Sequence, residues 1–171
     1  MHKRALIQLA ISIVLLSILS CDNAISQKND QSSKNSSDLK ISNMLKAFYN
    51  AYIILQSDIK PPKVQEEKVD SLLKRYCTSV FLNFYGTING PDELDWDPFL
   101  DAQFCSIDWL KSLTIKKDLK RNDLYYVSFI KDSSNNELTT IELSVIKEKD
   151  IYKIDSLPQL TRHIKFVRSK N

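Results

Sequence analysis

The stretch ELTTIELSVIKE, residues 137–148, decides the fold class, because its apolar and polar residues alternate. One face would carry Ile141, Leu143 and Val145, and the other Thr140, Glu142 and Ser144. Such alternation is typical of a strand with one buried face. Two more strand-like stretches flank it, at residues 124–132 and 151–156, and the links between them are short and turn-like. Short links join antiparallel neighbours, so the sequence predicts an antiparallel meander.

Upstream of these strands the apolar residues recur at helical spacing. We predict helices over residues 39–56 and 64–76, separated by Pro61 and Pro62, and a third turn or helix capped by Thr78. Helices followed by a strand meander indicate the α+β class, with N-terminal helices packed on a C-terminal sheet.

The segment DWDPFLDAQ, residues 95–103, lies in a long irregular stretch and is the one part of the chain that suggests chemistry. It places three carboxylates beside two large aromatic side chains. The candidate functional residues are Asp95, Trp96, Asp97, Phe99, Asp101 and Gln103.

Three interpretations of this segment remain open. In a structural one, Trp96, Phe99 and Leu100 dock on the core, and Asp97 accepts a backbone N–H at the turn of Pro98. In a second, the carboxylates bind a cation or ligand, since hard cations prefer oxygen ligands. In a third, Asp95 or Asp97 works with Asp101 in hydrolysis.

The N-terminus has the pattern of an exported lipoprotein. A basic start at Lys3 and Arg4 precedes a short apolar run, which ends at Ser20-Cys21. The run is short for a membrane span and is typical of a cleaved signal peptide. Cys21 is then the predicted lipid attachment site, with a plain signal peptide as the alternative.

The remaining chain divides by composition. We expect a signal peptide over residues 1–20, a flexible polar tether over 21–38, a single domain over 39–160 and a basic tail over 161–171. The chain has 24 Lys and Arg residues, and removal of Lys3 and Arg4 with the signal peptide leaves 22 against 21 Asp and Glu residues. This nearly neutral charge gives no positive electrostatic field that would attract nucleic acid. His163 would be the one remaining histidine, so a His-rich zinc site is excluded and any catalytic triad would have to use His163. We expect no metal site, no cofactor and no catalytic residues.

Two cysteines, Cys77 and Cys105, remain after lipidation of Cys21. An even pair in an oxidising compartment predicts a disulfide, and two buried free thiols are the alternative.

Several motifs together resemble one family. They are Phe48-Tyr49-x-x-Tyr52-Ile53, Tyr76-Cys77-Thr78, Asp95-x-Asp97-Pro98-Phe99-Leu100-Asp101-Ala102-Gln103 and Tyr152-Lys153-Ile154-Asp155. Over residues 45–157 the chain is similar to the YbjP/YqhG-like family of bacterial envelope proteins, a domain of unknown function. The resemblance implies an exported α+β domain related to the NTF2-like or cystatin-like folds. Some relatives carry an immunity-protein label against peptidoglycan-cutting amidases.

We therefore expect a lipoprotein anchored to the bacterial envelope, on the periplasmic or outer-membrane side. Its globular part is predicted to be a non-catalytic binding or inhibitory module, with an envelope protein or a peptidoglycan fragment as partner. The alternatives are a small cell-wall hydrolase that uses Asp97 and Asp101, and a purely structural lipoprotein.

Overall fold

A computed structural model describes residues 22–58, 61–88 and 96–162, with side chains from residue 35 onward. The chain divides into two compact units, residues 1–39 and 40–171. The second unit holds the sheet and the candidate site. The predicted signal peptide, Cys21 and Asp95 lie outside the described residues, as does the basic tail beyond Arg162.

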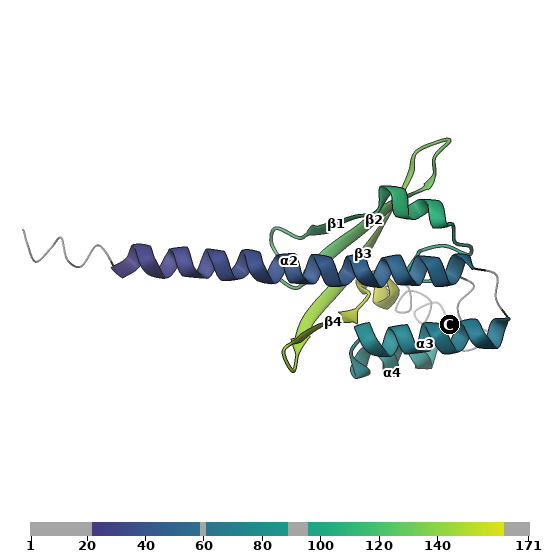
Figure 1. The fold of residues 1–171 in the computed structure, drawn as a ribbon, viewed down its shortest axis with the longest axis horizontal. Coiled ribbons are helices and arrows are strands. Elements are labelled where there is room, and N and C mark those ends of the chain that lie inside the picture. The colour runs from purple at the N-terminus through teal and green to yellow at the C-terminus, as the bar shows by residue number, and fades with distance from the viewer. Residues whose placement is uncertain (1–21, 59–60, 89–95, 163–171) are drawn as a thin grey trace, which may run out of the picture. The chain divides into compact units, whose positions relative to one another are not determined.

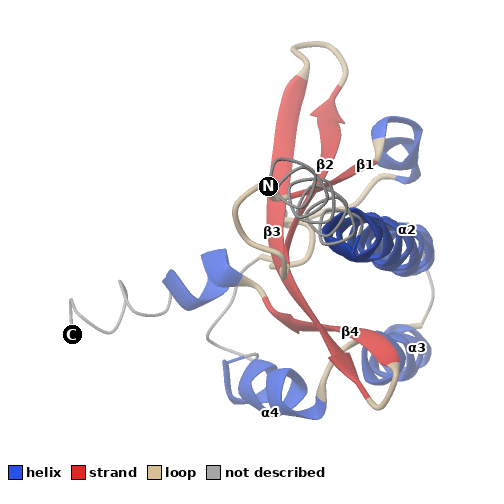
Figure 2. Ribbon diagram, turned by 90° about the vertical axis from the view of Figure 1, so that its left-hand side faces the viewer, coloured by secondary structure: helices blue, strands red, loops and turns tan. Residues whose placement is uncertain are grey.

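The second unit is built on a four-stranded antiparallel meander in the order β1-β2-β3-β4 (Figures 1 and 2). The strands are β1 (Thr114–Lys117), β2 (Leu124–Asp132), β3 (Glu137–Glu148) and β4 (Ile151–Ser156). In the register, Val127 lies opposite Ile141 and Tyr125 opposite Leu143. The α+β class and the meander predicted from the alternating residues are thus confirmed.

The helices precede the sheet in the chain. They are α2 (Asp22–Ser57), α3 (Pro62–Tyr76) and α4 (Ser79–Ile88), and a 3₁₀ helix, η1 (Ile107–Ser112), leads into β1. Figure 2 shows α3 and the C-terminal part of α2 on one side of the sheet. Helices α3 and α4 both contact β4, and η1 contacts β2.

One core joins the helices to the sheet. From α2 it takes side chains at helical spacing, which are Ile41, Leu45, Phe48, Tyr49, Tyr52 and Ile53. From the sheet it takes the alternating residues Tyr125, Val127, Phe129, Ile141, Leu143, Val145 and Ile154. In α2 and in the strands, the buried face is therefore the one that the helical and alternating spacing of apolar residues predicts.

The structure places the residues of the expected flexible tether, residues 21–38, in α2 from Asp22 onward. Residues 22–57 contain no Gly or Pro, so no residue type interrupts the helix. Extending a helix that packing already stabilises costs far less free energy than nucleating a new one. The polar composition of residues 22–38 does not show that such a packed helix follows them. Within the described residues, no helix is both long and apolar enough to cross a membrane.

Candidate functional site

The segment from Trp96 to Cys105 folds into a tight loop between α4 and η1. Asp97 and Ala102 close it, since the Asp97 N–H donates to the Ala102 carbonyl at 2.8 Å and the Leu100 N–H donates to the Asp97 carbonyl at 3.1 Å. The Asp97 carboxylate oxygen Oδ1 accepts the Phe99 N–H at 2.8 Å, which is the bond predicted for the turn at Pro98. Asp101 has a φ of 50°, a left-handed conformation that Asp tolerates better than most residues.

Phe99 and Leu100 anchor this loop, because both side chains are fully buried. The Phe99 ring lies 5.3 Å from the rings of Phe48 and Tyr52 on α2. It also lies 5.7 Å from the ring of Tyr85 on α4. Burial of a large side chain contributes about 1.5–3 kcal/mol, so Phe99 fixes the loop against two helices.

The anchored loop brings the Asp97 carboxylate over the last turns of α2. Tyr52 donates its hydroxyl to Asp97 Oδ2 at 2.8 Å, and Gln56 donates Nε2 to the same oxygen at 3.3 Å. Tyr52 and Gln56 are four residues apart and share a helix face. Gln65 of α3 fixes the Gln56 amide, since its Nε2 donates to Gln56 Oε1 at 3.0 Å.

Burial dominates the electrostatics of Asp97. The residue as a whole is partly exposed, but protein atoms surround its carboxylate group. This burial raises the pKa of Asp97 to about 6. The hydrogen bonds from Tyr52, Gln56 and Phe99, together with the nearby Leu100 N–H, oppose the rise, because they stabilise the charged form. Among the described residues, no cation is one of the main groups that shift this pKa.

A pocket of about 240 Å³ opens beside Asp97. It is lined by Gln56, Trp96, Asp97, Leu100, Ala102, Gln103, Phe104 and Cys105. The Phe104 ring is 72% exposed, so it lies at the surface of the protein. Pockets for drug-sized ligands measure about 300–1,000 Å³, so this one fits a smaller molecule or the end of a larger one.

Asp101 does not line the same pocket as Asp97. It lines a second one, of about 410 Å³, with Trp96, Thr140 and Gln159. Its carbonyl accepts Lys131 Nζ, and its carboxylate lies 3.9 Å from the same nitrogen. The structure therefore brings Asp97, Trp96 and Gln103 together but places Asp101, the second carboxylate of the hydrolase alternative, in a separate pocket.

The structure does not contain the predicted disulfide between Cys77 and Cys105, and both thiols are free in it. Cys77 joins α3 to α4 and pairs with Ile154 of β4 in an isolated bridge. Cys105 instead lies against α2, where its Sγ is 3.6 Å from the Ile53 carbonyl oxygen. Different elements thus hold the two residues, and burial raises the pKa of each thiol to about 12.

Two further motif segments meet at this joint. The Thr78 N–H donates to the Ile154 carbonyl, and the Thr78 hydroxyl donates to Asp155 Oδ1 at 2.9 Å. The same hydroxyl oxygen accepts the Phe81 N–H at 3.1 Å, which confirms Thr78 as the cap of α4. These bonds hold α4 against β4, and they give this cluster a structural role.

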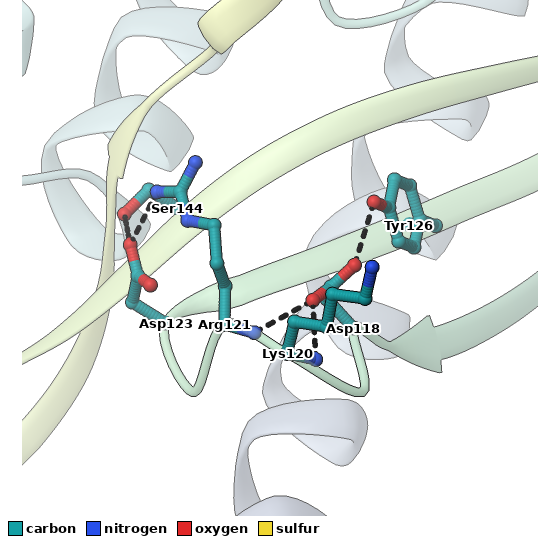
Figure 3. A network of polar contacts seen from close by, with 6 residues as sticks. All are labelled: Asp118, Lys120, Arg121, Asp123, Tyr126 and Ser144. Atoms are coloured by element: carbon teal, nitrogen blue, oxygen red, sulfur yellow. Dashed lines mark hydrogen bonds and ion pairs between the residues drawn. The ribbon is translucent and has the colours of Figure 1, made fainter.

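A second group of charged residues surrounds the turn between β1 and β2 (Figure 3). Asp118 Oδ1 accepts the backbone N–H groups of Lys120 and Arg121, and the Tyr126 hydroxyl donates to Asp118 Oδ2 at 2.8 Å. Asp123 Oδ2 accepts Arg121 at 2.8 Å and the Ser144 hydroxyl at 2.9 Å. The two carboxylates thus accept hydrogen bonds from the turn itself and from β2 and β3, which is a structural arrangement.

Sequence reasoning missed Gln56 and Gln65 as parts of the site. Gln56 follows Tyr52 by one helical turn near the end of α2, so two polar groups lie on an otherwise apolar helix face. This pattern in the sequence could have indicated a polar site, but the acceptor of both groups, Asp97, lies 41 residues away from Gln56. No short-range pattern connects them.

No family model and no curated protein matches the chain. A crystal structure of a protein of unknown function from Bacteroides thetaiotaomicron is similar, with a TM-score of 0.62 and 21% sequence identity. The similarity covers 75% of this chain and 97% of that one. At this identity the likeness shows the fold alone, and the relation to NTF2-like or cystatin-like folds stays a prediction.

Proposed function

We propose that the protein is a lipoprotein anchored to the bacterial cell envelope through Cys21, and that its globular unit is a non-catalytic binding or inhibitory module. The short apolar run that ends in a small residue and a cysteine, Ser20-Cys21, supports the anchor, because this is the pattern at which bacterial lipoproteins are cleaved and lipidated. The ligand or a terminal group of a partner enters the pocket beside Asp97. An envelope protein or a peptidoglycan fragment remains the expected partner.

One observation carries the binding function. The loop and α2 hold a charged side chain in a fixed orientation beside an open pocket, through the bonds from Tyr52, Gln56 and Phe99 to Asp97. Helix α3 contributes indirectly, because its Gln65 donates to the Gln56 amide oxygen. A neutral residue at this position would make the folded state more stable, because burial of a carboxylate costs free energy. Strained or costly groups are typical of functional sites, where the cost is retained for recognition.

The hydrolase alternative has a specific observation in its favour, because a carboxyl group with a pKa of about 6 suits a general acid. Against it, a glycoside hydrolase needs a second carboxylate across the same bond. Asp101 lines another pocket and pairs with Lys131. Among the described residues, no group of three or more His, Cys, Asp or Glu side chains could hold a metal ion.

The test of binding is affinity capture of the tagged lipoprotein from its own envelope extract, with Asp97→Asn as the site variant. Asp108→Asn is the matched control, because Asp108 is exposed on η1 and pairs with Lys111. We expect the wild type and Asp108→Asn to retain a stoichiometric partner that Asp97→Asn loses. Equal capture by all three proteins would contradict the Asp97 site, and release of cut sugar fragments would favour the hydrolase.

The anchor has a separate test. A fatty-acid probe should label the wild-type protein and should not label Cys21→Ala. Normal labelling of that variant would contradict lipidation at Cys21, while leaving the binding module unaffected.

A further inference from the structure

We propose that the pocket beside Asp97 binds the primary ammonium group of a small organic cation, with the Asp97 carboxylate as its counter-ion. The inference rests on the binding function proposed above and names its ligand class. It is argued from the charge of the pocket, the free valence of the carboxylate and the lining of the pocket.

The charge of the site is unbalanced. The donors that reach the Asp97 carboxylate are all neutral, namely the Tyr52 hydroxyl, the Gln56 amide and the Phe99 N–H. Within the described residues no lysine, arginine or histidine forms an ion pair with Asp97, whereas Asp101 of the same loop lies 3.9 Å from Lys131 Nζ. Buried charges in proteins are usually paired, so a cationic ligand would supply the missing partner.

The carboxylate also has room for another donor. A carboxylate can accept about four hydrogen bonds. Oδ2 already accepts hydrogen bonds from Tyr52 and Gln56, whereas Oδ1 accepts one, from the Phe99 N–H. The Leu100 N–H donates to the main-chain carbonyl of Asp97 instead. A guanidinium group prefers both oxygens for its planar fork, but an ammonium group acts as a point charge and needs one. The occupied Oδ2 therefore favours an ammonium group.

The lining of the pocket suits a short alkylammonium chain. Trp96 and Phe104 supply aromatic rings, and Leu100 and Ala102 supply apolar surface for methylene groups. Cations are attracted to the faces of such rings, most strongly to tryptophan. The volume of about 240 Å³ limits the buried part of the ligand to a few carbon atoms. A bare divalent metal is disfavoured, because it would need about six oxygen ligands.

The pH dependence of binding should come from Asp97 itself, whose pKa is about 6. Other titratable groups also face Asp97 from the elements packed around it. On α2 these are Tyr49 and Tyr52, whose pKa values burial raises well above the ordinary one. Cys105 in the loop and Cys77 beside β4 have pKa values raised to about 12. Tyr85 faces the site from α4, and Asp101 is paired with Lys131. Binding of an ammonium ion should therefore weaken as pH falls through about 6.

The test is an NMR titration of the ¹⁵N-labelled full chain in micelles with n-butylammonium at pH 7.5, and with n-butanol as the neutral probe of similar shape. We expect saturable shifts at the Trp96 indole and Gln56 amide signals with butylammonium, and at least about tenfold weaker binding of butanol. Asp97→Asn should lose about tenfold or more in affinity for butylammonium, while Asp108→Asn should bind like the wild type.

A second arm uses the unmutated protein and so does not depend on the folding of a variant. Lowering the pH from 7.5 to 5 should weaken butylammonium binding by about tenfold, because about a tenth of Asp97 stays ionised one unit below its pKa. Equal binding of butanol at the same signals, or unchanged affinity in Asp97→Asn or at pH 5, would overturn the ammonium inference and leave a binding pocket in place. If neither probe shifts the pocket signals, the inference also fails, and the capture experiment alone decides the binding function.

Discussion

The loop that carries Asp97 and the turn that carries Asp118 give their carboxylates the same kinds of hydrogen-bond donor. Each accepts a tyrosine hydroxyl at 2.8 Å, from Tyr52 in the loop and from Tyr126 in the turn. Each also accepts backbone N–H groups of its own segment. Yet the pKa of Asp97 is raised to about 6, whereas that of Asp118 is lowered.

The difference between the two carboxylates is their burial. Desolvation is the largest cause of the shift at Asp97, and the hydrogen bonds reduce the shift without reversing it. At Asp118 the backbone bond from Arg121 is the largest cause and desolvation is minor. Hydrogen bonds of similar length thus leave one acid hard to ionise and the other easy to ionise. The comparison teaches that the packing of the Phe99 loop, and not the donor set, makes Asp97 unusual.

The largest expected effect comes from removing that packing. Phe99→Ala should lower the free energy of unfolding by about 3–5 kcal/mol, because the ring is fully buried against two helices. Leu119→Ala in the exposed turn is the control and should change it by less than about 0.5 kcal/mol. Urea unfolding measures both. A wild-type stability for Phe99→Ala would mean that the loop is not held as the structure shows.

The second effect is a pH dependence of opposite sign at the two acids. Asp97 has a folded pKa of about 6, above the value of about 3.9 for an unfolded chain. The folded state therefore binds the proton more tightly, and stability contributed by this group falls as pH rises from about 4 to about 6. The shift of about two units corresponds to a loss on the order of 3 kcal/mol.

Substitutions separate these two contributions. Asp97→Asn should flatten the decline between pH 4 and pH 6 in a series of urea unfolding curves. Asp118 has a lowered pKa, so its contribution is present above the unfolded value and is lost as pH falls. Asp118→Asn should therefore change the acid side of the curve in the opposite sense. If Asp97→Asn leaves the slope unchanged, the pKa of Asp97 is not raised.

The third effect concerns the tyrosine donors. Tyr52→Phe removes a bond to a charged acceptor, which is worth about 1.5–3 kcal/mol, and should raise the pKa of Asp97 further because that bond lowers it. Carboxyl ¹³C NMR titration measures the pKa. Tyr126→Phe is the matched change at the exposed acid, where two backbone N–H groups remain, and should have the smaller effect on stability. An unchanged pKa of Asp97 in Tyr52→Phe would contradict the bond.

Three strands, β2 to β4, were predictable to the residue, because alternation depends only on neighbours two positions apart, whereas the short strand β1 was not predicted. The ranges 124–132, 137–148 and 151–156 agree with β2, β3 and β4. The helix predicted over residues 64–76 begins earlier, at Pro62, since proline is tolerated in the first helical turn. The 3₁₀ helix η1 was missed within a stretch predicted to be irregular, although Ser106 caps it through the Asp108 N–H.

The site was predictable only in its local part. The turn at Asp97 and the burial of Phe99 follow from residues within four positions of each other. The bond from Tyr52 to Asp97 spans 45 residues, and the place of Asp101 in a second pocket depends on Lys131 and Thr140 of the sheet. The positions of Cys77 and Cys105 were not predictable for the same reason, because an even number of cysteines in an oxidising compartment does not show which elements hold them.

The smallest expected effect tests a hydroxyl that the site does not use. Tyr49 precedes Tyr52 by three residues on α2, is fully buried, and among the described residues its hydroxyl has no hydrogen-bond partner. Its ring packs edge-on against Phe48 at 5.3 Å, a contact that phenylalanine keeps. Tyr49→Phe should therefore leave the free energy of unfolding unchanged or raise it by up to about 1 kcal/mol, because an unpaired buried hydroxyl is costly. A loss in urea unfolding as large as that of Tyr52→Phe would show that the Tyr49 hydroxyl has a partner, and that the polar site extends one turn further along α2.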